Sequence, residues 1–187
     1  MAAAIAFLVT RQQDRVSFAV ARDGLRDFQR PLGSFAQLAS VLTVMEQTQP
    51  AGEARLADAL ASMARLVPRR GVLILFSDLL DDLDATLEAL SIWTHRGSDA
   101  IVFHTLHPDE LNLPQWHEAT FVDSESGGHV KLNVADVRSA YDDRMRQFLD
   151  RCATWCRARR IDYNLVSTAT PYHKALEHYL FARAAVT

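Results

Sequence analysis

The sequence is poor in cysteine and contains no Walker A loop, no G-x-G-x-x-G fingerprint and no H-E-x-x-H motif. Its two cysteines, Cys152 and Cys156, lie four residues apart, with no histidine pair at zinc-finger spacing. This pattern favours reduced thiols that fill the core from one helical face. The opening segment MAAAIAFLVT is too short to span a bilayer and has no basic residues before its apolar stretch. We therefore expect no membrane segment in this chain and a cytoplasmic location.

A strong positive charge is also absent. The formal net charge is -3, and the basic residues are scattered along the chain, so no nucleic-acid partner is expected. Half of the 187 residues are hydrophobic, which is typical of a soluble globular protein. This length fits one compact domain over residues 1–187.

Apolar periodicity alternates between strand and helix along the chain. Ser34 with Gln37 is a capping box, Asn133 is a helix cap, and Pro171 suits a first helical turn. Helices are expected over 3–13, 35–45, 56–67, 83–95, 134–152 and after 170; strands over 72–76, 99–106 and 161–167; and hairpins around Asp23-Gly24 and Gly127-Gly128. The strand at 72–76 is expected to be buried on both faces. This order predicts an α/β sandwich with a mostly parallel sheet.

Asp78 is the leading candidate for a functional residue. It follows the strand that ends in Ser77, and functional groups gather at the carboxyl ends of parallel strands. A carboxylate there could ligate Mg²⁺, which prefers oxygen ligands. The alternative is structural: Asp78 bonds loop amides, and Asp81 and Asp82 cap the next helix and complement its dipole, as Asp84 also would.

The other candidates have weaker support. His104 and His107, near Asp109, Glu110 and His117, lie three residues apart. On a strand they would face opposite sides of the sheet and could not chelate together, unless the strand ends between them. Ser77 lacks the G-x-S-x-G elbow that would make it a nucleophile. Polar groups at Ser167-Thr168 mark a third strand end.

Several segments, in order and spacing, resemble one family. These are RRGVLILFSDLLDD, HPDELNLP, FVDSESG, VRSAYDDRM, CRARRIDYNLVST and ALEHYLFAR, together with the upstream RQQDRVSFAVARDGLRDFQRP and PAGEARLADAL. They resemble the domain-of-unknown-function 58 family, which is similar to von Willebrand factor A domains. The resemblance implies a Rossmann-like three-layer α/β sandwich. It also implies a role as an adaptor alongside MoxR-type AAA+ ATPases and a client protein, in chaperone-like or metal-insertion assemblies.

The resemblance also implies a metal-ion-dependent adhesion site, of which this sequence keeps little. Asp78 matches the aspartate that follows the fourth strand of that fold. The threonine position falls in GEARL, where Ala54 stands and Arg55 follows. The D-x-S-x-S segment is absent. One remaining ligand cannot complete an octahedral oxygen shell, so no cofactor is expected beyond weak Mg²⁺ binding at Asp78.

The family's first strand is missing as well. It would lie in the middle of the sheet, between the strands matching 15–21 and 72–77. Unpaired backbone groups there would each cost roughly 1–3 kcal/mol. We expect that the chain is truncated at its N-terminus, while direct closure of the sheet and a strand donated by another chain remain alternatives.

Two functions follow as hypotheses. The first is a non-enzymatic adaptor that works with a MoxR-type AAA+ ATPase and carries a degenerate adhesion site. The alternative is a Mg-dependent hydrolase or phosphoryl-transfer enzyme that uses Asp78 with Asp81 or Asp82, although all of those carboxylates come from one loop. A third reading is a partial domain without an independent role.

Overall fold

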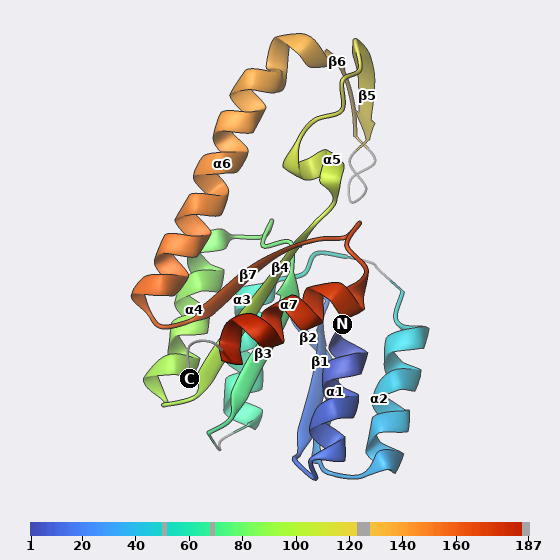
Figure 1. The fold of residues 1–187 in the computed structure, drawn as a ribbon, viewed down its shortest axis with the longest axis vertical. Helices are drawn as coiled ribbons and strands as arrows, with labels where there is room; N and C mark the ends of the chain where they lie inside the picture. The colour runs from blue at the N-terminus through green and yellow to red at the C-terminus, as the bar shows by residue number, and fades with distance from the viewer. Residues whose placement is uncertain (50–51, 68–69, 123–127, 185–187) are drawn as a thin grey trace.

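The computed structural model describes residues 1–49, 52–67, 70–122 and 128–184. Helices and strands alternate through most of the chain, as the apolar periodicity predicts (Figure 1). In chain order the elements are α1 (Ala2–Arg11), β1 (Val16–Ala21), β2 (Leu25–Leu32), α2 (Phe35–Gln47), α3 (Leu56–Leu66), β3 (Val72–Ser77), α4 (Leu83–His95), β4 (Asp99–Leu106), α5 (Pro108–Leu111), β5 (Glu118–Val122), β6 (His129–Asn133), α6 (Val134–Ala158), β7 (Asp162–Ser167) and α7 (Tyr172–Ala184).

The central sheet is parallel, in the order β3-β4-β7. Ser77 pairs with His104, and Leu106 pairs with Ser167, so the three strands end at one edge. The two remaining ladders are antiparallel hairpins, β1-β2 and β5-β6. The turn of the first contains Asp23 and Gly24 at φ 49° and 88°, the left-handed conformation that glycine favours. The turn expected at Gly127 lies outside the described residues.

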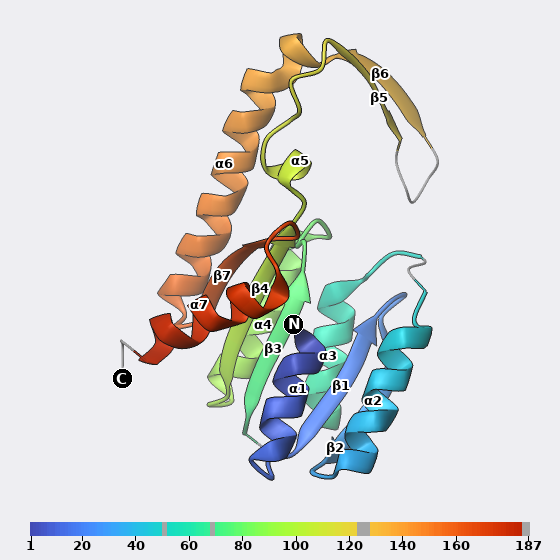
Figure 2. The ribbon, with the colours of Figure 1, turned by 45° about the vertical axis from the view of Figure 1, so that its right-hand side comes forward.

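Helices cover both faces of the central sheet, which makes three layers (Figure 2). On one face, α3, α4 and α6 pack on β3 and β4 around Leu75, Leu90 and Val102. On the other, α1 and α7 pack against Ile101 and Phe103. The predicted α/β class with a parallel sheet is therefore confirmed.

Within the described strands, β1 pairs with β2, β3 pairs with β4, and no ladder joins β1 to β3. The prediction that β3 is buried on both faces was wrong. Leu73 and Leu75 are buried, but Ile74 and Phe76 are half-buried and Val72 is 54% exposed. The physical reason is that β3 is an edge strand of the three-stranded sheet, and Val72, its first residue, lies at the exposed end of the strand.

The predicted helix starts hold with one difference. Asn133 caps α6 by accepting from the backbone N–H of Ala135. Ser34 caps α2 by accepting from the N–H of Gln37, but the Gln37 amide donates to the carbonyl of Arg30 instead of returning to Ser34. The capping box is therefore half-formed, because the end of β2 offers Gln37 a nearer acceptor.

An arm projects beyond the carboxyl end of the sheet (Figures 1 and 2). It contains α5, the β5-β6 hairpin and the first half of α6, whose 25 residues span about 37 Å. Two hydrogen bonds tie the α5 loop to α6, from Arg138 to the carbonyl of Pro114 and from Tyr141 to the carbonyl of Glu110, both at 2.6 Å. Among the described helices, none combines the length and apolarity that crossing a membrane requires.

Candidate functional site

The candidate site is the strand-end rim, which we define as the residues that follow β3, β4 and β7 at their common edge: Ser77 to Asp82, His107 to Glu110, and Ser167 to Thr168. Thr168 donates its backbone N–H to the carbonyl of Leu106, which joins two of these strand ends. The parallel register places the polar groups at one edge, as the sequence predicts.

Asp78 stands on a tight turn at this rim. The Ser77 hydroxyl accepts from the N–H of Leu79 at 3.0 Å, and an Asp78 carboxylate oxygen accepts from the N–H of Leu80 at 3.2 Å. Leu79 has φ 55° and is buried, which anchors the turn to the core. Asp78 is exposed, and among the described residues a hydrogen bond is found to only one of its two carboxylate oxygens. The structural alternative, that Asp78 bonds loop amides, is correct for that oxygen.

The neighbouring acids have separate partners. Asp82 caps α4 by accepting from the N–H of Ala85, as predicted. The prediction that Asp81 caps the next helix was wrong: one of its oxygens accepts from the N–H of Leu56 at 2.6 Å, so it caps α3, and the other accepts from the N–H of Asp82 at 2.8 Å. A loop residue can do this because the start of α3 lies beside the end of β3. Asp84 lies in the first turn of α4, as predicted, and also pairs with an arginine of α6.

Ala54 and Arg55 lie where α3 begins. The carbonyl of Ala54 accepts from the N–H of Gly24 at 3.4 Å, and its side chain offers no oxygen. Arg55 is the N-cap residue of α3 in the left-handed conformation, at φ 46°, and it makes no capping bond with its side chain. Its guanidinium pairs with Asp58 at 2.5 Å. Asp81 supplies the missing cap from outside the helix.

His104 is fully buried beneath the rim. Its Nε2 lies 2.7 Å from the carbonyl oxygen of Asp78, and its Nδ1 lies 2.7 Å from the hydroxyl of Tyr163. A carbonyl can only accept, so Nε2 carries the proton and Nδ1 accepts from the tyrosine. Burial lowers the pKa of His104, opposed by the hydrogen bond to Asp78 and the charges of Asp78 and Glu110. Burial likewise raises the pKa of Tyr163, which remains a donor.

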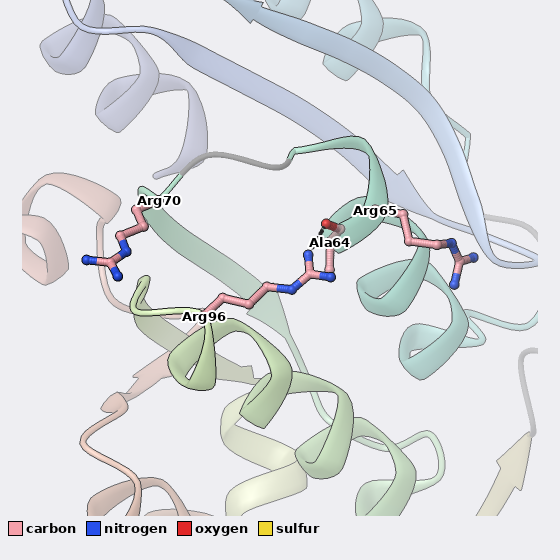
Figure 3. A pocket seen from close by; sticks show the side chains of 4 residues that line it. All are labelled: Ala64, Arg65, Arg70 and Arg96. Atoms are coloured by element: carbon pink, nitrogen blue, oxygen red, sulfur yellow. Dashed lines mark hydrogen bonds between the residues drawn. The ribbon is translucent and has the colours of Figure 1, made fainter.

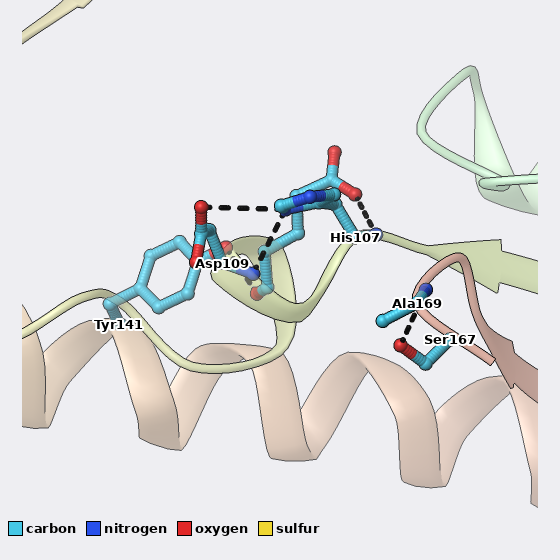
Figure 4. Close-up of polar contacts among 6 residues, drawn as sticks. His107, Asp109, Tyr141, Ser167 and Ala169 are labelled. Carbon is cyan, nitrogen blue, oxygen red and sulfur yellow. Dashed lines mark hydrogen bonds and ion pairs between the residues drawn. The ribbon is translucent and has the colours of Figure 1, made fainter.

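β4 ends at Leu106, so His107 lies beyond the strand, as the exposed N-cap residue of α5, and the opposite-face argument does not apply; His104 is buried within the strand. The Nδ1 of His107 accepts from the N–H of Asp109 at 3.2 Å and lies 3.4 Å from that carboxylate (Figure 4). Glu110 accepts from the backbone N–H of His107, and Ser167 accepts from that of Ala169. These side chains organise the short α5 and the β7 turn. His117 lies further along, exposed in the arm.

The two cysteines are core residues, as predicted, and both are fully buried free thiols. Burial raises the pKa of Cys152 to about 11 and that of Cys156 to about 12. A thiol with such a pKa is almost entirely protonated at neutral pH and is a poor nucleophile.

The rim does not fit a divalent metal. Through the described ranges, no three His, Cys, Asp or Glu side chains are grouped in a way that could hold a metal ion. Asp78 offers one open carboxylate oxygen, Asp81 is committed to α3, and Ala54 has no oxygen to contribute. Mg²⁺ would have to keep nearly all of its waters there.

Sequence reasoning missed the link from Tyr163 through His104 to the Asp78 turn. The strand register pairs Tyr163 with Val102, which lies two positions before His104. Nothing in the residue pattern indicates that the Tyr163 hydroxyl reaches the His104 ring. Arg138 and Tyr141, which brace the arm, were missed in the same way, because both of their acceptors are backbone carbonyls.

Comparisons with known proteins agree on the family and the fold. Residues 1–149 match the family described as "Protein of unknown function DUF58". The segments quoted from beyond residue 149 lie outside that match. No curated protein matches the chain.

Two solved structures are similar in fold. One is the conserved hypothetical protein BatB from Bacteroides thetaiotaomicron, with 12% identity, TM-score 0.50, and coverage of 97% of this chain and 87% of that one. The other is an aerotolerance-related membrane protein from Bacteroides fragilis NCTC 9343, with multiple mutations to serines. It has 14% identity, TM-score 0.56, and coverage of 95% and 85%. At these identities the likeness concerns the fold alone.

Proposed function

The chain belongs to the family described as protein of unknown function DUF58, and from that membership and the geometry of the strand-end rim we propose that it is a non-enzymatic protein-interaction domain. In this proposal the domain is of von Willebrand A type and works as an adaptor with a MoxR-type AAA+ ATPase. The ATPase partner comes from the family resemblance set out above.

One observation carries the proposal: the rim presents an exposed carboxylate, Asp78, on a turn anchored to the core. Ser77, Leu79 and His104 all hold that turn by hydrogen bonds or burial. A rigid, exposed carboxylate suits docking of a cationic partner group, such as an arginine that binds it with two hydrogen bonds. Metal-dependent hydrolysis or phosphoryl transfer needs several carboxylates that converge on one centre, and no such group is found among the described residues.

The open side of β3 supports the von Willebrand A assignment. That fold has a central strand between the strands that match β1 and β3, and within the described strands no ladder joins β1 to β3. We propose that a strand from a preceding segment or from another chain pairs with both. It would satisfy the backbone groups of β1 and β3 and add its own polar residues beside Asp78.

The test is a pull-down with the MoxR-type ATPase encoded in the same genome, using this chain and its Asp78→Ala variant. The proposal expects capture of the ATPase by the parent chain and a clear loss of capture with the variant. Asp109→Ala is the matched control, because Asp109 is an exposed rim carboxylate that serves α5. Failure of the parent chain to bind any such ATPase contradicts the adaptor role.

The alternative enzyme is tested separately by calorimetry with Mg²⁺ and Mn²⁺. The adaptor proposal expects binding weaker than about millimolar, since a single carboxylate does not displace the ion's hydration shell. Micromolar binding that Asp78→Ala abolishes would favour the metal-dependent hydrolase or phosphoryl-transfer enzyme.

A further inference from the structure

The amino-terminal edge of the sheet differs in charge from the rim. We define the basic edge as Arg11, Arg15, Arg30, Arg65, Arg70 and Arg96, which lie where α1, α3 and α4 end, where β1 and β3 begin and where β2 ends (Figure 2). All six side chains are exposed. The same edge of the described chain also carries the acids Asp14, Asp99 and Asp162, and Arg157, Arg159 and Arg160 where α6 ends and β7 begins. The opposite end carries the rim acids Asp78, Asp81, Asp82, Asp109 and Glu110, and beside the rim lie Asp23 and Glu53 with Arg22 and Arg55. A chain of net negative charge is therefore polarised along the strand direction.

Helix ends explain only part of this arrangement. Arg11 and Arg65 lie in the last turns of α1 and α3, and Arg96 is the C-cap residue of α4, so each complements a helix dipole. Arg15 and Arg70 lie just before β1 and β3, and Arg30 lies near the end of β2, so none of these three arginines complements a helix dipole. Moreover, Arg70 takes part in no hydrogen bond or ion pair found among the described residues.

The shape of the basic edge indicates what kind of anion it suits. An open surface pocket of about 520 Å³ is lined by Ala64, Arg65, Arg70 and Arg96, and within the described part of the chain no carboxylate lines it. Arg96 donates to the carbonyl of Ala64, and Arg65 donates to Ser62 at 3.0 Å. In Figure 3 the three guanidinium groups form a row with Arg96 in the middle, and they do not converge on one point. A row matches several phosphates side by side better than one small anion.

Exposed apolar side chains accompany the arginines. Leu66 is 52% exposed beside Arg65, Val72 is 54% exposed just after Arg70, and Phe35 is 61% exposed at the start of α2. Mixed arginine and apolar exposure fits the interface of a bilayer, where guanidinium groups meet headgroup phosphates and apolar groups enter the acyl boundary. The phosphate backbone of a nucleic-acid duplex offers arginine partners but nothing for these apolar groups.

We propose that the basic edge docks on the surface of an anionic phospholipid bilayer. The row of guanidinium groups binds headgroup phosphates, and Leu66 and Val72 insert between the headgroups. In this orientation the strand-end rim and the arm point away from the membrane, toward a soluble partner. The proposal does not depend on the identity of that partner.

The experiment measures co-sedimentation of this chain with vesicles of phosphatidylcholine alone or of phosphatidylcholine with phosphatidylglycerol, at low and at physiological salt. Binding is expected only with phosphatidylglycerol, and it should weaken as salt rises. The triple variant Arg65→Gln/Arg70→Gln/Arg96→Gln should reduce the partition coefficient at least about tenfold. Leu66→Ser/Val72→Thr should reduce it by a smaller factor, with the salt dependence unchanged.

The matched control is Lys131→Gln/Arg144→Gln/Arg146→Gln, which changes the net charge equally at exposed positions of β6 and α6 in the arm. This control should retain binding within about twofold of the parent chain. An equal loss in both triple variants, or no binding of the parent chain at low salt, overturns the proposal. Saturable binding of inorganic phosphate or of an RNA duplex without vesicle binding also overturns it. If circular dichroism shows that the triple variant of the basic edge does not fold, the single variant Arg70→Gln decides the test. Its partition coefficient should then be at least about twofold lower than that of the parent chain.

Discussion

Replacing His104 with leucine tests whether the Asp78 turn is held from the core. Leucine fills a similar volume but leaves two buried partners, the carbonyl of Asp78 and the hydroxyl of Tyr163, without their hydrogen bonds. Each orphaned group costs about 1–3 kcal/mol. We therefore expect His104→Leu to lower the free energy of unfolding by about 2–5 kcal/mol, a large part of the stability of an ordinary domain.

A double-mutant cycle isolates the link between the two side chains. Tyr163→Phe alone should cost about 1–3 kcal/mol, because it strands Nδ1 of His104. In the double variant neither group remains unpaired, so its cost should fall short of the sum of the single costs by about 1 kcal/mol or more. Urea unfolding followed by tryptophan fluorescence gives all three values.

Hydrogen exchange localises the effect. The amides of Leu79 and Leu80, which bond to Ser77 and Asp78, should lose protection in His104→Leu before the core strands do. His117→Leu, at an exposed position of the arm, is the matched control and should change stability by less than about 0.5 kcal/mol. A cost below about 0.5 kcal/mol for His104→Leu, or strict additivity with Tyr163→Phe, would refute the reasoning.

Three further predictions follow from the same contacts. Asp81→Ala should lower the free energy of unfolding by about 1 kcal/mol and speed hydrogen exchange at the first amides of α3. Asp82→Ala should cost a similar amount and speed exchange at the first amides of α4. Faster exchange at the other helix in either variant would contradict the assignment. Burial lowers the pKa of His104 below its ordinary 6.5, so the unfolded state binds that proton first. Stability should therefore fall as pH drops below about 6.5 and level off below the folded pKa, with that component absent in His104→Gln, as urea titrations at several pH values would reveal. Cys152 and Cys156, with pKa values of about 11 and 12, should react with a thiol reagent only as fast as the chain unfolds. Rapid labelling of the native chain would contradict their burial.

The sequence predicted the fold well where one local signal decides the outcome. Helical stripes, the Asp23-Gly24 turn and the cap at Asn133 are local, and each was found in place. Burial of the cysteines also followed from a helical stripe. The Asp82 cap was predicted because cap and helix are adjacent in the chain.

What the sequence could not predict depends on contacts between distant segments. Asp81 and Asp82 are equivalent by spacing, and only the position of α3 beside the end of β3 separates them. The exposure of Val72 depends on which strands pair with β3. The His104–Tyr163 bond joins residues 59 apart in the chain, so no window of sequence contains it.

The most direct test of the account is a titration calorimetry measurement of the purified chain with the MoxR-type ATPase of the same genome. The account predicts saturable binding that weakens at least about tenfold in Asp78→Asn, which removes the charge and keeps the shape of the rim, as expected for a charge-assisted contact. Asp109→Asn should leave the affinity unchanged within about twofold. Equal affinity for the parent chain and Asp78→Asn would contradict the claim that the Asp78 rim is the docking site.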